Sequence, residues 1–291
     1  MGAGPRVRVL VVGGTGESFD GDTRREVTGL LAGVTGALDD RFLPQWVGYP
    51  ASYGPAPHVS GMSFADSVDA GVRRVSAALA ETAGPVMMVG YSQGAVVIRR
   101  ALAELPASST AQILAVGFVA DPHQPPDAVA GCHGWGVAGP GPVLPPGLPA
   151  RWVGTPADMI CNAAQDSFVR DIADLTRALT LAAPRRWMTT IWKVLRDNSF
   201  QNADVTSVRP AQWRRDVARL ASAWCEVRGY LPPVITWRGM AFGNSIGGRH
   251  TAYHDEPYRR DSVTDPCTTG CESLARWMQV QVTFTLGGVP N

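Results

Sequence analysis

The sequence predicts an α/β fold, in which a mainly parallel β-sheet is covered by helices on both faces. In the first half of the chain, short runs of β-branched and apolar residues alternate with stretches of helical apolar periodicity. The runs are almost continuously apolar, which is typical of parallel strands buried on both faces. The chain has 291 residues, of which 45% are hydrophobic, and this is enough to bury a large core. We therefore expect one domain spanning residues 1–291.

Turn-forming and helix-capping residues mark the boundaries between these elements. The first apolar run ends in "GGTG", another ends at Pro50, and Ser63 is placed to cap the helix that follows it. Strands are expected at 6–12, 45–50, 85–89, 112–120 and 151–155, and helices at 27–38, 63–79 and 93–105.

The second half of the chain has a different character. Residues 121–149 are rich in proline and glycine and predict a long surface loop, which is uncommon without a function. Residues 166–230 predict a helical insertion, or cap, that packs onto the sheet and contains Trp187, Trp192, Trp213 and Trp224. A strand is expected to resume at 232–237, followed by a glycine-rich loop and a final helix at 271–284.

Composition excludes several functional classes. The net charge is +1 with no block of Lys or Arg, so nucleic acid is not an expected partner. No run of about eighteen apolar residues predicts a transmembrane span, and the N-terminus does not resemble a signal peptide. The five cysteines are scattered and predict no disulfide framework; Cys267 and Cys271 are close enough to pair, but we find no set of metal ligands. We expect no metal and no cofactor.

The most informative stretch is "GYSQG", Gly90 to Gly94, which matches G-x-S-x-G. It lies between a predicted strand and a predicted helix, where glycines allow a sharp turn that exposes the serine hydroxyl. A tight turn with a helix-capping serine is the structural alternative. A serine hydroxyl is a poor nucleophile by itself and needs a histidine base oriented by a carboxylate. Ser92 is the predicted nucleophile.

The partners of this serine are less sharply defined. The order serine, acid, histidine is that of the α/β-hydrolases, and only His250 and His254 lie late enough in the chain, both in a loop after a predicted strand. For the acid, Asp121 and Asp158 each follow a predicted strand, and the pattern favours Asp158 only slightly.

The tetrahedral oxyanion of an acyl transfer needs two donors. The backbone amide of Gln93, next to the serine, is one candidate. The loop "VVGGTGES" after the first strand supplies Thr15 as the other, through its amide and hydroxyl. A phosphate or dinucleotide cradle is the rival interpretation, but the glycine spacing fits neither G-x-G-x-x-G nor a P-loop.

With these residues placed, the sequence resembles the cutinase-like branch of the α/β-hydrolases, and within it the mycobacteriophage lysin B esterases. "GGTGE" resembles the oxyanion loop of that branch, "GYSQGA" its serine motif, "ADMIC" its acid segment and "HTAY" its histidine segment. The resemblance implies a triad of Ser92, Asp158 and His250, with Thr15 and Gln93 as the oxyanion hole. The long separation of acid and histidine departs from compact cutinases and fits the helical insertion of lysin B enzymes.

The resemblance also implies a function. Lysin B enzymes hydrolyse the ester bond between mycolic acids and arabinogalactan, so the expected partner is the mycolyl-arabinogalactan of the host cell wall. The expected protein is encoded by a phage, made in the host cytoplasm and active at the host cell envelope. The tryptophans of the insertion are expected to contribute one or two side chains to an acyl trough. A monomer without a separate peptidoglycan-binding domain is expected. The alternatives are a cutinase-like lipase acting on other lipid esters and a non-catalytic wall- or lipid-binding module.

Overall fold

The core of the protein is a five-stranded parallel sheet. In the computed structural model, which describes residues 6–180, 183–197, 201, 210–237, 240–259 and 264–286, the strand order is β2-β1-β3-β4-β5. The strands are β1 (Val7–Val12), β2 (Phe42–Trp46), β3 (Val86–Tyr91), β4 (Ile113–Val119) and β5 (Ala150–Val153). Four of the five strands expected in the first half lie close to their predicted positions, whereas the strand expected at 45–50 begins and ends earlier, as β2. The predicted parallel α/β fold is confirmed.

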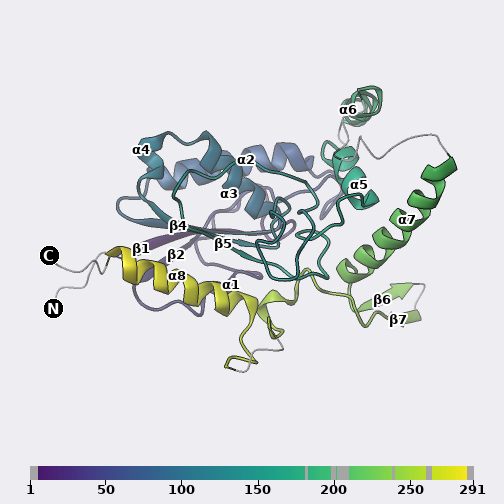
Figure 1. The fold of residues 1–291 in the computed structure, drawn as a ribbon. Helices are drawn as coiled ribbons and strands as arrows, with labels where there is room; N and C mark the ends of the chain where they lie inside the picture. Colours follow the sequence, from purple (N-terminus) through teal and green to yellow (C-terminus); the bar gives the residue numbers. More distant parts are fainter. Residues whose placement is uncertain are drawn as a thin grey trace.

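Helices cover both faces of this sheet (Figure 1). On one face lie α2 (Phe64–Ala80), α3 (Gln93–Glu104) and the short α4 (Ala107–Thr110); on the other lie α1 (Ala32–Thr35) and α8 (Gly270–Leu286). Strand β1 serves both layers, since Val9 and Val11 belong to the core under α8 while Leu10 and Val12 belong to the core under α2 and α3. Burial on both faces explains why the strands read as continuous apolar runs.

The position of the site follows from the strand order. Chain progression reverses direction between β1 and β3, which are paired in parallel from Arg8↔Val86 to Val12↔Gly90. The loops leaving the carboxyl ends of these two strands therefore diverge and leave a crevice, which is where open α/β sheets bind ligands. The loop after β1 carries Thr15, and the turn after β3 carries Ser92.

The helix expected at 27–38 is much shorter than its periodicity predicted. Only Ala32–Thr35 is α-helical, as α1. Gly29 has a positive φ of 69°, and the Glu17 carboxylate accepts a hydrogen bond from the backbone N–H of Leu30 at 2.8 Å. These local features replace the first helical turns, although the apolar residues Leu30, Leu31 and Val34 are still buried against the sheet layer.

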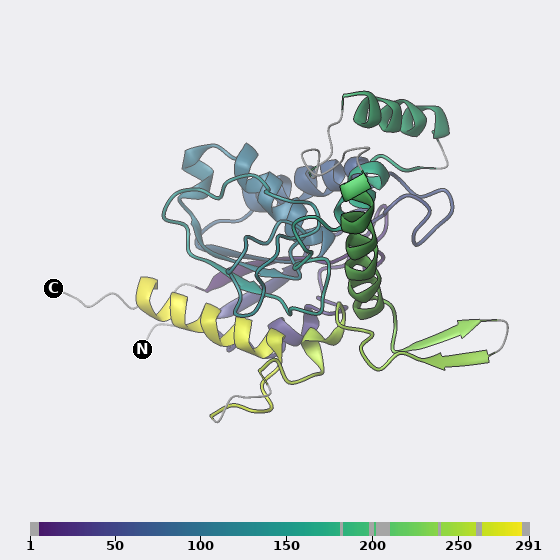
Figure 2. The same cartoon turned by 45° about the vertical axis from the view of Figure 1, so that its right-hand side comes forward.

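The insertion contains α5 (Phe168–Thr176), α6 (Pro184–Arg196) and α7 (Pro210–Tyr230), which lie beyond the carboxyl ends of the strands (Figures 1 and 2). The strand expected at 232–237 does not rejoin the main sheet. It forms β6 (Val234–Trp237), which pairs antiparallel with β7 (Met240–Gly243) in a hairpin projecting from the molecule. Pairing with the next few residues closes a very short loop, which costs less chain entropy than a return to a distant sheet edge.

The final helix is confirmed, since the predicted 271–284 falls within α8. Ser63 caps α2 as expected, because its hydroxyl accepts a hydrogen bond from the backbone N–H of Asp66 at 3.1 Å. Among the residues described, no helix combines the length and apolarity needed to cross a bilayer.

Candidate active site

Ser92 occupies a strained corner between β3 and α3. Its φ of 51° and ψ of −118° are rare for a non-glycine residue and cost on the order of 1–3 kcal/mol. The flanking glycines make the corner possible: a Cβ on Gly94 would lie 2.1 Å from the carbonyl oxygen of Val12, and one on Gly90 would lie 2.7 Å from the backbone nitrogen of Ala95. The backbone N–H of Ser92 donates to the Val119 carbonyl at 2.9 Å, which fixes the corner to β4.

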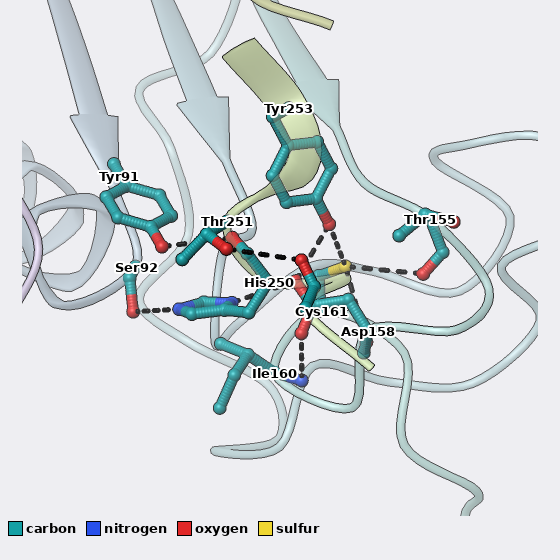
Figure 3. Close-up of polar contacts among 10 residues, drawn as sticks. Tyr91, Ser92, Thr155, Asp158, Ile160, Cys161, His250, Thr251 and Tyr253 are labelled. Atoms are coloured by element: carbon teal, nitrogen blue, oxygen red, sulfur yellow. Dashed lines mark hydrogen bonds and ion pairs between the residues drawn. The ribbon is translucent and has the colours of Figure 1, made fainter. Parts of the chain in front are cut away.

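The structure brings Ser92, His250 and Asp158 into one hydrogen-bonded chain (Figure 3). The Ser92 Oγ lies 3.0 Å from His250 Nε2, and His250 Nδ1 lies 2.9 Å from Asp158 Oδ2. Because Nδ1 faces a carboxylate, it carries the ring proton, which leaves Nε2 to accept a proton from the serine. Asp158 is fully buried and His250 nearly so. The predicted residues thus meet from three distant parts of the sequence.

Asp158 is held by donors on both oxygens. The backbone N–H of Ile160 donates to Oδ1 at 3.0 Å, and the Tyr253 hydroxyl donates to Oδ2 at 2.8 Å, the same oxygen that faces His250. Burial by itself raises the pKa of Asp158, but the electrostatic interaction and hydrogen bond with His250, together with the hydrogen bonds from Tyr253 and Ile160, outweigh burial and hold the net pKa below its usual value. The carboxylate is therefore ionised at neutral pH.

Two further tyrosines fix the histidine. The Tyr91 hydroxyl donates to the His250 carbonyl at 3.0 Å. The rings of Tyr91 and Tyr230 lie with their centroids 5.1 and 5.2 Å from the imidazole of His250. Sequence reasoning assigned no role to Tyr91, Tyr230 or Tyr253. Only Tyr253 carried a signal, as the last residue of "HTAY", one helical turn after His250.

Asp121 and His254, the alternative candidates for the acid and the base, lie outside this hydrogen-bonded chain. Asp121 forms a buried ion pair with Arg99, whose Nη2 lies 2.7 Å from Oδ2, and also accepts from the indole N–H of Trp152 at 3.0 Å. His254 is exposed, and its Nδ1 lies 2.9 Å from the Thr251 carbonyl rather than near the serine. The geometry favours Asp158 and His250 over both.

Thr15 and Gln93 also meet next to the serine. The Thr15 hydroxyl donates to Gln93 Oε1 at 3.0 Å, and Gln93 Nε2 donates to the Ser52 carbonyl at 3.0 Å. These bonds tie the loop after β1 to the start of α3. The backbone N–H of Gln93, as the first residue of α3, has no partner within the helix. Both residues line the same cavity as Ser92.

That cavity has a volume of about 620 Å³, within the range of ligand-binding pockets. Its walls come from α2, α3, the proline-rich loop and the insertion. Much of its wall is apolar and includes the side chains of Phe64, Val68, Val96, Val137, Met159, Ile160, Val169 and Ile172. The loop at 121–149, expected to lie on the surface, contributes His123 and Val137 to this wall, so the loop helps to form the site.

The prediction that tryptophans of the insertion line an acyl trough is wrong for those whose side chains the structure describes. Trp192 and Trp224 are exposed, Trp187 donates its indole N–H to the Leu175 carbonyl at 3.0 Å, and none of the three lines the cavity. The side chain of Trp213 lies outside the described residues. The helical spacing identified an apolar face correctly, but spacing alone cannot say whether that face meets the cavity or solvent.

The five cysteines are unpaired, and Cys271 is buried under α1 while Cys267 is exposed. Within the described ranges, no three His, Cys, Asp or Glu side chains are grouped as metal ligands.

The parallel sheet, the serine corner at its centre and the histidine and acid delivered by later loops define an α/β-hydrolase fold. A family model described as the PE-PPE domain matches residues 42–135, a stretch that contains Ser92. No curated protein matches the chain.

Solved structures give similarities of low extent. A cutinase-like protein from Cryptococcus sp. is 18% identical, with 55% of this chain and 80% of that chain covered and a TM-score of 0.42. An acetylxylan esterase is 16% identical, with 64% and 100% covered and a TM-score of 0.42. A Trichoderma reesei cutinase, in complex with a phosphonate inhibitor, is 26% identical, with 42% and 56% covered and a TM-score of 0.29.

Proposed function

We propose that this protein is a serine hydrolase of carboxylic esters, with Ser92 as nucleophile, His250 as general base and Asp158 as the residue that orients the base. The hydrogen-bonded chain from Ser92 Oγ through His250 to Asp158, with distances of 3.0 and 2.9 Å, carries the proposal. Ser92 occupies a strained turn and lines a mainly apolar cavity, and such strain is typical of functional sites.

The reaction proceeds in two halves. Ser92 Oγ attacks the ester carbonyl carbon while His250 Nε2 accepts the hydroxyl proton, and the Asp158 carboxylate stabilises the imidazolium. The Gln93 amide, with Thr15, stabilises the oxyanion of the tetrahedral intermediate. His250 then protonates the departing alcohol, leaving the acyl group on Ser92. A water molecule deprotonated by His250 attacks that acyl group and releases the acid and the free serine.

We further propose that the substrate is a lipid ester, and specifically the ester of a long acyl chain with a polysaccharide, such as mycolyl-arabinogalactan at the envelope of a phage's bacterial host. The apolar wall of the 620 Å³ cavity beside Ser92 supports the lipid part of this proposal. The order and content of the motifs "GGTGE", "GYSQGA", "ADMIC" and "HTAY" support the lysin B part. A cutinase-like lipase acting on other lipid esters is the alternative.

The deciding experiment incubates delipidated mycobacterial cell wall with the wild-type protein and with Ser92→Ala, and quantifies free mycolic acid. Release by the wild type alone supports both the chemistry and the substrate. If neither protein releases mycolic acid but a chromogenic ester is cleaved only when Ser92 is present, the ester hydrolase stands and the lipase alternative replaces the cell-wall substrate. If Ser92→Ala retains wild-type activity on both substrates, the proposed function is wrong.

A further inference from the structure

Helix α7 carries an apolar stripe that faces solvent. Val217, Leu220 and Trp224 recur at intervals of three and four residues, so they share one face of the helix. Their side chains are 68%, 59% and 62% exposed. The opposite face is the buried one, where Arg219 and Ala223 face the protein. The sequence predicted that the apolar stripe would pack against the sheet, and the structure places it outward.

Helix α6 also exposes apolar side chains, and none of its residues whose side chains the structure describes is buried. It is joined to the rest of the protein by the indole N–H of Trp187, which donates to the Leu175 carbonyl, and by the exposed Arg186, whose Nη1 lies 3.1 Å from Asp66 Oδ2. Met188 and Trp192, one turn apart, are 65% and 64% exposed. Figure 2 shows α6 standing clear of the sheet layers on the same side of the molecule as α7. We refer to Met188, Trp192, Val217, Leu220 and Trp224 together as the α6–α7 surface.

The charge of this region differs from that of the rest of the chain. Residues 184–230 contain nine Lys and Arg against four Asp and Glu, a net charge of +5, whereas the whole chain has +1. The remaining residues therefore have a net charge of −4. Helix α6 alone contains four basic residues and no acidic one. Arg186, Arg196 and the buried Arg219 are paired with acidic side chains, so the positive charge exposed beside the apolar stripes comes from other cations of the segment, among them Arg185 and Lys193 on α6.

We propose that the α6–α7 surface docks on an anionic lipid surface. Exposed Trp and Met beside Lys and Arg is the composition of helices that lie in the headgroup region of a membrane, where apolar side chains enter the acyl boundary and cations meet lipid phosphates. Exposed apolar side chains without this charge would equally suit a second protein chain, whereas the exposed cations favour an anionic lipid.

Docking there would serve the proposed ester hydrolysis, and in this respect the inference rests on the proposed function. Helix α7 ends at Tyr230, whose ring lies 5.2 Å from the His250 imidazole and also lines the cavity. The helix that carries the apolar stripe therefore ends beside His250, the proposed general base. Binding to a lipid surface would bring the cavity to its substrate without any change in the distances between Ser92, His250 and Asp158.

The test measures binding separately from catalysis. Full-length Ser92→Ala protein is sedimented with vesicles of pure phosphatidylcholine and with vesicles that also contain phosphatidylglycerol. We expect binding mainly to the anionic vesicles, weakened about tenfold or more by Arg185→Glu with Lys193→Glu, since each cation near an anionic surface contributes measurably. Met188→Glu with Trp192→Glu, and Trp224→Glu by itself, are expected to weaken binding to a similar extent.

Matched controls lie elsewhere on the molecule. Phe284→Glu removes an equally exposed apolar side chain from α8, and Arg73→Glu with Arg74→Glu reverses two exposed cations on α2. Neither control is expected to change binding more than twofold. Circular dichroism of every variant confirms folding.

Three results would overturn the inference. The first is equal binding to neutral and anionic vesicles, and the second is no binding to either. The third is a dimer, detected by sedimentation velocity, that is lost when the α6–α7 surface is substituted. That result would mean that a second copy of the chain covers the stripe. The same surface substitutions are also made in protein that retains Ser92, and hydrolysis of a soluble short-chain ester is measured. Loss of vesicle binding with full hydrolysis would show that the surface acts in binding and is not needed for the chemistry of the proposed function.

Discussion

The Tyr253 hydroxyl donates to Asp158 Oδ2 at 2.8 Å, on the same oxygen that faces His250 Nδ1 at 2.9 Å. Tyr253 is buried, and burial raises its pKa well above the usual value, so the hydroxyl stays protonated and can donate to the carboxylate. With the Ile160 N–H on the other oxygen, it leaves Asp158 one orientation, and this orientation holds the imidazole toward Ser92.

Replacement of Tyr253 by Phe should lower kcat by about tenfold with little change in KM, because the Asp158 carboxylate loses one donor and holds His250 less firmly. The free energy of unfolding should fall by about 1.5–3 kcal/mol, the usual contribution of a hydrogen bond to a charged group. Tyr258→Phe removes a hydroxyl that accepts a hydrogen bond from the Gly154 N–H at 3.3 Å and serves as the control. An equal loss of kcat in both variants would argue against a positioning role for Tyr253.

The two late histidines should behave very differently. His250→Ala should lower kcat by about 10³-fold or more, because no other base faces the serine in the described structure. His254→Ala should leave activity within about twofold of wild type, since its ring faces the Thr251 carbonyl. Steady-state kinetics on a chromogenic ester compare the two variants. A larger loss in the His254 variant would reverse the assignment.

Asp121 should prove structural. Arg99→Leu leaves a buried carboxylate without its ion-pair partner, and we expect a loss of about 3–5 kcal/mol in the free energy of unfolding. The double variant Arg99→Leu, Asp121→Leu should recover much of this loss. Urea denaturation measures both. Ester hydrolysis per folded molecule should stay close to wild type in the double variant; its abolition would revive Asp121 as the acid.

The stability contributed by Asp158 should depend on pH in a defined direction. Its pKa in the folded protein lies below the usual value of about 3.9, so the ionised form is favoured by folding. This contribution is fully present above about pH 4 and is lost as the pH falls through the lower folded pKa. The difference in unfolding free energy between wild type and Asp158→Asn should therefore narrow in acid. Urea titrations at neutral and acid pH test this, and a constant difference would contradict it.

The cavity should set the chain-length preference. Ala173 lines the cavity, and Ala173→Phe fills part of it. We expect kcat/KM for a chromogenic palmitate to fall by about tenfold while that for the acetate stays unchanged, because only the long chain needs the lost volume. Ala103→Phe, at an exposed position on α3, is the control. Equal losses on both esters would mean that the cavity does not hold the acyl chain.

The sequence alone predicted much of the fold and the serine. Apolar runs predicted the strands of the parallel sheet, and helical periodicity predicted the helices, because the local spacing of apolar residues depends on which face of each element is buried. Gly90, Ser92 and Gly94 predicted the sharp turn, since only glycine tolerates the close approach to Val12 and Ala95.

The tertiary structure decided what depends on contacts between distant residues. It placed Asp158 and His250, and not Asp121 or His254, in one hydrogen-bonded chain with Ser92, because such proximity depends on how the insertion and its flanking loops fold back. It also revealed Tyr253 on the acid and turned the stripe of α7 outward. Sequence spacing identifies an apolar face of a helix, but only the packing of the whole chain determines whether protein or solvent meets it.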